Sequence, residues 1–109
     1  MTTIFTDANF KTEVLGTDKI TVIDFWATWC PPCLALGPTI DALAIQYSGK
    51  IKVGKVNTDE NPEISITYGV TNLPCVLFVK DGIVVDKQIG LASRAVYDKK
   101  IQTLLNRDN

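Results

Sequence analysis

An apolar segment that runs into two closely spaced cysteines is the feature that most constrains what this chain can fold into. Residues 20–27 are apolar almost throughout, which is typical of a central strand buried on both faces of a sheet. A Cys-Pro-Pro-Cys sequence at residues 30–33 follows, and apolar residues then recur at helical spacing up to residue 47. Because proline is tolerated in the first turn of a helix, we expect strand, turn and helix in that order, with both cysteines at the turn.

The remaining chain alternates between strand and helix patterns. We expect strands at residues 3–5, 52–57, 75–80 and 83–89, and helices that end near residue 16, span residues 62–68 and follow Ser93. Asp81-Gly82 is a strong hairpin signal, and Pro38 should kink the long helix in which it lies. The order predicts an α/β fold with a central mixed sheet, parallel crossovers first and an antiparallel hairpin last, flanked by helices on both faces.

Size and charge narrow the class of protein. The 109 residues should form a single domain over 1–109, and 46% hydrophobic residues suffice for a core. A net charge of −1 with scattered basic residues argues against nucleic acid and membrane surfaces as partners. The sequence has no apolar run long enough to span a bilayer and no leader pattern after Met1, so we expect a cytoplasmic protein if Met1 is the native start.

Cys30 and Cys33 are the candidate reactive groups. A disulfide between them would close so short a loop that it adds little stability, which favours a chemical role over a structural one. The start of a helix favours the thiolate, which is the reactive form of cysteine. Since Pro31 and Pro32 have no N–H, the N–H of Cys33 is the obvious donor to the Cys30 sulfur. We expect Cys30 to be the more exposed thiol.

Other interpretations of the cysteine pair stay open at this point. The two residues would also fit as small buried hydrophobic side chains, or as half of a metal site. Zinc prefers four ligands, whereas the chain has three Cys and no His, so we expect no metal unless two chains share a zinc or iron–sulfur site. The absence of His also excludes a Cys–His or Ser–His nucleophile pair.

Asp24 is the one charged residue of the apolar segment. A buried carboxylate is costly to ionise, so its pKa should be raised, which suits a proton acceptor near neutral pH. Lys55, in the middle of the strand at residues 52–57, is its candidate partner. The alternative is a purely structural Asp–Lys pair at the edge of the sheet, and strand periodicity alone does not decide between the two.

Pro74 and Cys75 open a later apolar strand. From the residues alone, a trans peptide bond before Pro74 is the better expectation, because only about one X–Pro bond in twenty is cis. Cys75 fits a small side chain packed in the core, which is where free cysteine is often found. The alternative is a regulatory thiol that exchanges with Cys30 or takes glutathione.

Together these features resemble the thioredoxin family over essentially the whole chain. The most specific part is the sequence at residues 22–33. Weaker matches follow in the family's order, namely Pro38, residues 55–62, Tyr68-Gly69-Val70 with Leu73-Pro74, residues 78–82, and Gly90.

The resemblance implies a thioredoxin fold and the activity of a general protein-disulfide reductase. Cys30 would attack a target disulfide and Cys33 would resolve the mixed disulfide. Asp24 would take the proton from Cys33 through water, while Lys55 would adjust the pKa of Asp24. Pro74 would follow a cis peptide bond.

The resemblance also implies partners. Disulfide-containing proteins would dock on a flat surface formed by Trp29, Pro31, Pro32, Thr58, Asn72, Leu73, Gly90 and Leu91. An NADPH-linked thioredoxin reductase would reduce the oxidised pair again, so no cofactor is expected to bind, and the chain is expected to be a monomer.

Three residues depart from the family pattern. Pro31 stands where Gly is usual, Leu34 where Lys is usual, and Cys75 where Thr is usual. Because of Pro31, one alternative function stays open: the chain could be a specialised thioredoxin-like protein that serves one redox pathway, or an oxidant. A second alternative is a non-catalytic binding module that uses the surface formed by Trp29, Leu73 and Leu91.

Overall fold

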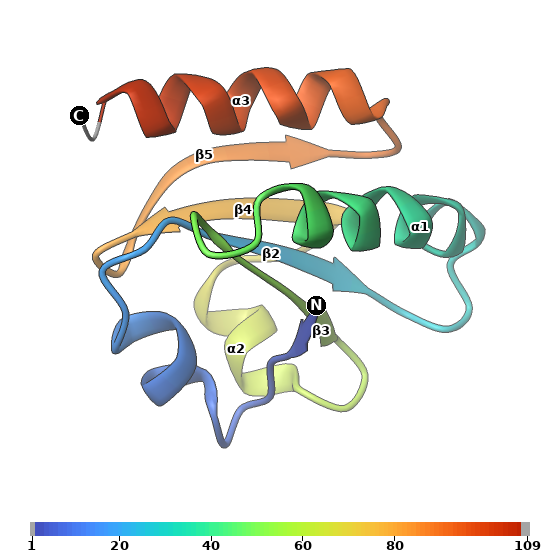
Figure 1. The fold of residues 1–109 in the computed structure, drawn as a ribbon. Coiled ribbons are helices and arrows are strands. Elements are labelled where there is room, and N and C mark those ends of the chain that lie inside the picture. Colours follow the sequence, from blue (N-terminus) through green and yellow to red (C-terminus); the bar gives the residue numbers. More distant parts are fainter. Residues whose placement is uncertain (1, 108–109) are drawn as a thin grey trace.

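The chain folds into a five-stranded mixed sheet with helices on both faces, as a computed structural model shows for residues 2–107 (Figure 1). In chain order the elements are β1 (Thr3–Ile4), η1 (Lys11–Leu15, a turn of π-helix), β2 (Thr21–Trp26), α1 (Pro31–Gln46), β3 (Lys52–Asn57), α2 (Pro62–Thr67), β4 (Cys75–Lys80), β5 (Ile83–Ile89) and α3 (Arg94–Arg107). The predicted order of elements and the α/β class are therefore confirmed.

The apolar segment lies at the centre of the sheet. The strands are ordered β1-β3-β2-β4-β5, with β1, β3 and β2 parallel and β4 antiparallel to both β2 and β5. Because β2 has a neighbouring strand on each side and apolar clusters cover both faces of the sheet, its residues are buried from Thr21 to Phe25. Asp24 is therefore in the central strand, and the alternative of a structural pair at the sheet edge is wrong.

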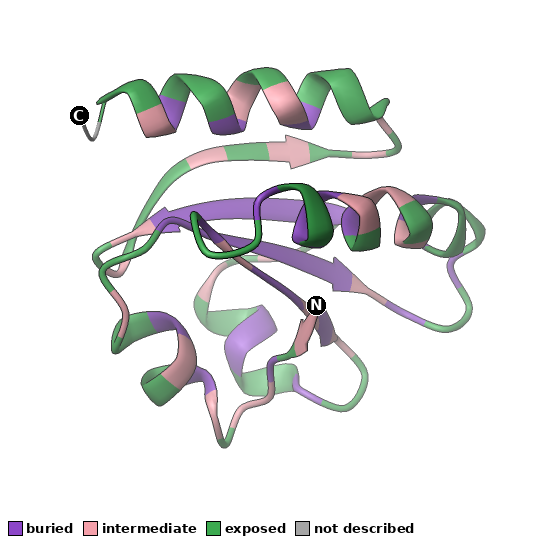
Figure 2. Cartoon of the chain, viewed as in Figure 1, coloured by how far each residue is buried: buried purple, intermediate pink, exposed green. Residues whose placement is uncertain are grey.

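Two separate clusters of apolar side chains cover the two faces of the sheet. On one face, residues of α1 and α3 such as Leu36, Ile40 and Ile101 pack on Val22 of β2. On the other face, residues of η1 and α2 pack on Phe25 and its neighbours. Figure 2 shows that β2 and β4 are buried along most of their length, whereas β5 at the edge is largely exposed.

Turn chemistry accounts for the ends of several elements. Asp81 and Gly82, with φ of 53° and 78°, both adopt the left-handed conformation that a tight hairpin between β4 and β5 requires. The helix α1 continues through Pro38 as a single element. Because Pro38 has no N–H, the carbonyl of Leu34 receives no helical hydrogen bond from it.

The start of α2 is capped from a distant part of the chain. The side chain of Asn61, the residue before α2, makes no cap, and it instead accepts a hydrogen bond from the N–H of Asp7 at 2.9 Å. The carboxylate of Asp7 in turn accepts from the N–H groups of Glu63 and Ile64 at 3.3 and 2.9 Å. The N-terminal segment therefore holds α2 against the sheet. None of the helices within residues 2–107 is long and apolar enough to cross a membrane.

Candidate active site

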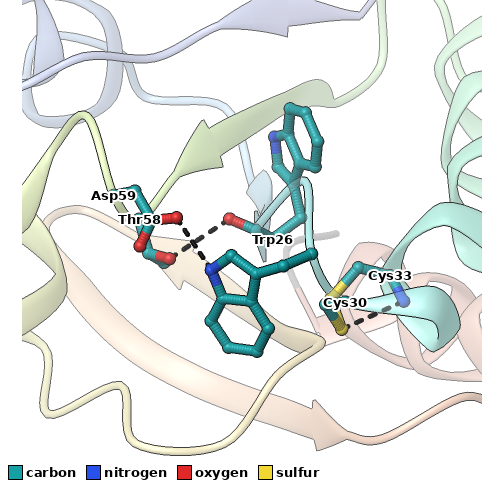
Figure 3. The surroundings of a disulfide bond; sticks show 6 residues. Trp26, Cys30, Cys33, Thr58 and Asp59 are labelled. Atoms are coloured by element: carbon teal, nitrogen blue, oxygen red, sulfur yellow. Dashed lines mark hydrogen bonds between the residues drawn. A yellow bond between two sulfur atoms is a disulfide. The ribbon is translucent and has the colours of Figure 1, made fainter.

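Cys30 and Cys33 form a disulfide at the start of α1 (Figure 3). Their Cα atoms lie 5.3 Å apart. Cys30 is the residue that caps α1, and its sulfur accepts a hydrogen bond from the N–H of Cys33 at 3.3 Å. This is the donor predicted from the two prolines. Once the disulfide is opened, the same N–H and the positive end of the helix dipole favour a thiolate on Cys30.

The two sulfur-bearing residues differ little in exposure. Cys30 exposes 4% and Cys33 exposes 2% of its surface, so the expected difference between the two thiols is small in the oxidised protein. Both pack with Ala27 beneath Trp26 and Leu73. A target must therefore approach Cys30 through the residues that surround it.

Exposed apolar residues surround the disulfide. Trp29 exposes 66% and Leu91 exposes 59% of its surface, and the prolines at positions 31 and 32 are exposed as well. The peptide bond between Leu73 and Pro74 is cis, as the family resemblance implied. Gly90 donates its N–H to the carbonyl of Pro74 at 2.9 Å, which places the Gly90–Leu91 turn next to the cis-proline.

A hydrogen bond across two loops fixes the Trp29 ring. The indole Nε1–H of Trp29 donates to a carboxylate oxygen of Asp59 at 2.8 Å. Thr58 is held in the same region, because its hydroxyl donates to the carbonyl of Trp26 at 3.3 Å (Figure 3). The N–H of Thr58 donates to the same carbonyl at 2.9 Å. Sequence reasoning missed Asp59, since nothing in the linear pattern brings the loop after β3 to the loop after β2.

A cavity of about 240 Å³ reaches from Cys33 to Asp24. Lys55 of β3 and Asp41 of α1 also line it. Asp41 was not a predicted site residue. A signal for it existed, because Cys33, Gly37 and Asp41 follow one another at intervals of four residues and so share one face of α1.

Asp24 is buried and almost without partners. Asp24 exposes 1% of its surface, and its Oδ1 atom has no hydrogen-bond partner among residues 2–107. Burial raises the pKa of Asp24 to about 7, against the lowering effect of Lys55 and with a further raising effect of Asp41. The raised pKa expected from the sequence is confirmed.

Lys55 makes its ion pair with Asp41 and not with Asp24. It lies directly across from Asp24 in the pairing of β2 with β3, but its ammonium pairs with Asp41 of α1 at 3.1 Å. The two candidate partners therefore do not form a direct ion pair. The positive end of Lys55 is drawn toward α1 instead, and it acts on Asp24 from a distance.

Cys75 is a free, buried thiol on the other face of the sheet. It packs with Phe25, Leu77 and Val79 in the cluster covered by η1 and α2, whereas Asp24 and Cys33 line the cavity beneath α1. Burial raises the pKa of the Cys75 thiol, which disfavours the reactive thiolate. This arrangement supports the packed interpretation, and a regulatory exchange with Cys30 stays a prediction. Within the described part of the chain, no cluster of three or more acidic, Cys or His side chains is arranged to hold a metal ion.

Comparison with known proteins assigns this arrangement to one family. The family profile described as Thioredoxin matches residues 1–103. A protein named thioredoxin from Chlorobaculum thiosulfatiphilum is 48% identical over 96 residues, which cover 88% of this chain and 89% of the relative. Thioredoxin 1 of Nostoc sp. is 43% identical over 97 residues, covering 89% of this chain and 91% of the relative. The M-type chloroplastic thioredoxin of Pisum sativum is 40% identical over 99 residues, covering 91% of this chain and 58% of the relative.

Proposed function

This chain belongs to the thioredoxin family and is a thiol-disulfide oxidoreductase that cycles Cys30 and Cys33 between dithiol and disulfide, and we propose how its residues divide the reaction. The roles rest on one observation, that Asp24 and Cys33 line the same cavity behind the disulfide. They extend the family's chemistry to particular atoms of this chain.

In the first step, the Cys30 thiolate attacks one sulfur of a target disulfide. The S–S bond of the target breaks, one target sulfur leaves as a thiolate that takes up a proton, and the other stays bonded to Cys30. In the second step, Cys33 loses its proton and attacks the Cys30 sulfur. The second target sulfur leaves and is protonated, and the Cys30–Cys33 disulfide closes. The target gains two electrons from the pair, one proton that Cys33 gives up and one proton from solvent, which had taken the Cys30 proton when the thiolate formed.

Asp24 is the proton acceptor for Cys33 in the second step. Its pKa of about 7 lets the carboxyl group take up and release a proton near neutral pH. The cavity of about 240 Å³ is large enough to admit water, which would carry the proton from the Cys33 thiol to the unpartnered Oδ1 atom. Lys55 tunes the carboxyl group through its positive charge.

Replacing Asp24 by asparagine tests this role. We expect Asp24→Asn to slow the resolution of a Cys30-bound target about 100-fold at neutral pH, because water replaces a positioned base. Formation of the mixed disulfide should not be slowed. Stopped-flow single turnovers with a fluorescent disulfide peptide separate the two steps. Glu13→Gln, which removes a carboxylate that pairs with Lys52 at 2.6 Å, is the control. Equal resolution rates in Asp24→Asn and the parent would refute the role.

The docking surface is formed by the exposed residues around the cysteines, with Trp29, Leu91, Pro31 and Pro32 on it and Leu73 and Gly90 beside the cis-proline. Such an exposed apolar patch next to a reactive group is typical of a site for protein partners. The backbone of Leu73 is free of strand pairing, since β4 begins at Cys75, and would pair with an extended segment of the target.

Electrons reach the oxidised pair from NADPH through a flavoprotein thioredoxin reductase that takes this chain as its substrate, with no cofactor bound to the chain. The chain works as a monomer in the cytoplasm. A free Cys75 fits this compartment, because the cytoplasm is reducing. Insulin-disulfide reduction with a thioredoxin reductase should consume NADPH only when chain and reductase are both present. If dithiothreitol supports insulin reduction while the reductase does not, the result favours the alternative associated with Pro31, a chain that serves a dedicated partner.

A further inference from the structure

Lys55 and Asp24 are neighbours that do not pair. They lie directly opposite each other in the register of β2 with β3, and both line the cavity behind Cys33. Directly opposed side chains on adjacent strands are within reach of one another. The Lys55 ammonium nevertheless lies 3.1 Å from Asp41 on α1, and Oδ1 of Asp24 has no hydrogen-bond partner among residues 2–107.

The position of Asp41 is itself fixed. The hydroxyl of Thr2 donates to Oδ1 of Asp41 at 2.8 Å, the same oxygen that pairs with Lys55. One turn earlier on α1, Gly37 presents no side chain, and a Cβ atom there would lie 3.6 Å from the Lys55 nitrogen. The ammonium is thereby held against the surface of α1. Burial acts to raise the pKa of Asp41, but the hydrogen bonds from Thr2 and Lys55 and nearby positive charge, including that of Lys55, together lower it, which favours the ionised form.

We propose that Asp41 is a positioning residue, which holds the Lys55 ammonium against α1 and so leaves the Asp24 carboxyl without an ion-pair partner, free to exchange a proton with Cys33. This inference rests on the proposed role of Asp24. An ammonium in contact with Asp24 would favour its ionised form and make it a weaker base. Asp41 prevents that contact, and its own negative charge acts on Asp24 in the same direction.

No other group named around Asp24 takes over the effect of the Lys55 position on the pKa of Asp24. Lys55 is the cation that faces it from β3, and Asp41 and Cys33 face it from α1. Tyr97 of α3 is buried with an unpartnered hydroxyl among the described residues, and burial followed by the charge of Asp24 raises its pKa to about 12, so it stays neutral. From β4, Cys75 lies on the opposite face of the sheet. Of these groups, Lys55 is therefore the one whose charge opposes the effect of burial on the pKa of Asp24.

The test is a carboxyl-carbon NMR titration of Asp24 in the reduced Asp41→Asn protein. We expect the midpoint to fall by about 1 pH unit or more below that of the parent, because Lys55 is released toward Asp24. The pH at which the resolution rate is half maximal should move in the same direction. Asp41→Glu, which keeps the charge, should keep most of the parent's midpoint. Glu13→Gln is the matched control, because it frees Lys52 of the same strand on the opposite face of the sheet.

The same titration in Lys55→Gln protein separates the positioning of Lys55 from the direct effect of the Asp41 charge on Asp24. In Lys55→Gln protein, Asp41→Asn should lower the Asp24 midpoint by much less than it does when Lys55 is present. An equal fall in both backgrounds, or no fall in either, would overturn the proposal. If Asp24→Asn slows resolution while Asp41→Asn leaves the titration unchanged, only the inference about Asp41 fails. If Asp24→Asn has no effect on resolution, the role of Asp24 fails instead.

Discussion

Replacing Cys30 by serine should lower the rate of disulfide reduction by at least about 1,000-fold, since the thiolate is the nucleophile and a serine hydroxyl is not ionised near neutral pH. The structure gives the reason for choosing Cys30. Its sulfur caps α1 and accepts the N–H of Cys33 at 3.3 Å, so the helix stabilises charge on that atom. Insulin reduction with dithiothreitol as electron donor measures the loss.

Cys33→Ser should fail in a different way. Cys30 still attacks, but nothing resolves the product, so about one target molecule per chain should remain bonded to Cys30 and be visible by mass spectrometry. Cys75→Ser is the control and should keep turnover, because Cys75 packs on the other face of the sheet. Trapping of a target by Cys30→Ser but not by Cys33→Ser would reverse the assignment of the two cysteines.

Asp24→Asn should stabilise the protein by up to about 4 kcal/mol above neutral pH. The pKa of Asp24 is raised by burial from 3.8 to about 7, so the native state binds this proton more tightly than the unfolded chain does. Stability is therefore lost as pH rises from about 4 to about 7, and the full cost of the buried charge is present above that window. Asparagine has a similar shape and carries no charge at any pH.

Urea unfolding at about pH 8 and about pH 4 measures this effect. The gain from Asp24→Asn should be large at the higher pH and small at the lower one, because the parent's carboxyl is already neutral there. Glu13→Gln, which changes the charge of a half-exposed residue, should show no comparable gain at either pH. A gain that is the same at both pH values would mean that packing, not ionisation of Asp24, is responsible.

Local patterns predicted most of the fold. The spans of β3, β4 and β5 agree with the expected ones, because turn residues such as Asp81 and Gly82 bound them. The donor to Cys30 was predictable as well, since two prolines leave only one nearby N–H. The cap of α2 by Asp7 was not predictable, because it joins residues more than fifty positions apart in the chain.

The candidate site was predictable only where a single strand or turn determined it. Asp24 stands out as a charge inside a buried strand, and its raised pKa followed from that alone. The pairing of Lys55 with Asp41 depends on how α1 lies across the sheet, which no local pattern specifies. The cis peptide bond before Pro74 could not be predicted from the residues alone, which favoured a trans bond. Only the resemblance to a family predicted it.

The central position of β2 has a consequence for how the molecule opens. Native-state fluctuations release sheet edges and termini first, and the innermost strand exchanges its amide hydrogens only when the whole domain unfolds. The turn that carries the reactive sulfurs is attached directly to that strand and to the helix that follows it. Fraying at β1 or β5 can therefore leave the redox centre assembled, and its chemistry survives as long as the domain itself does.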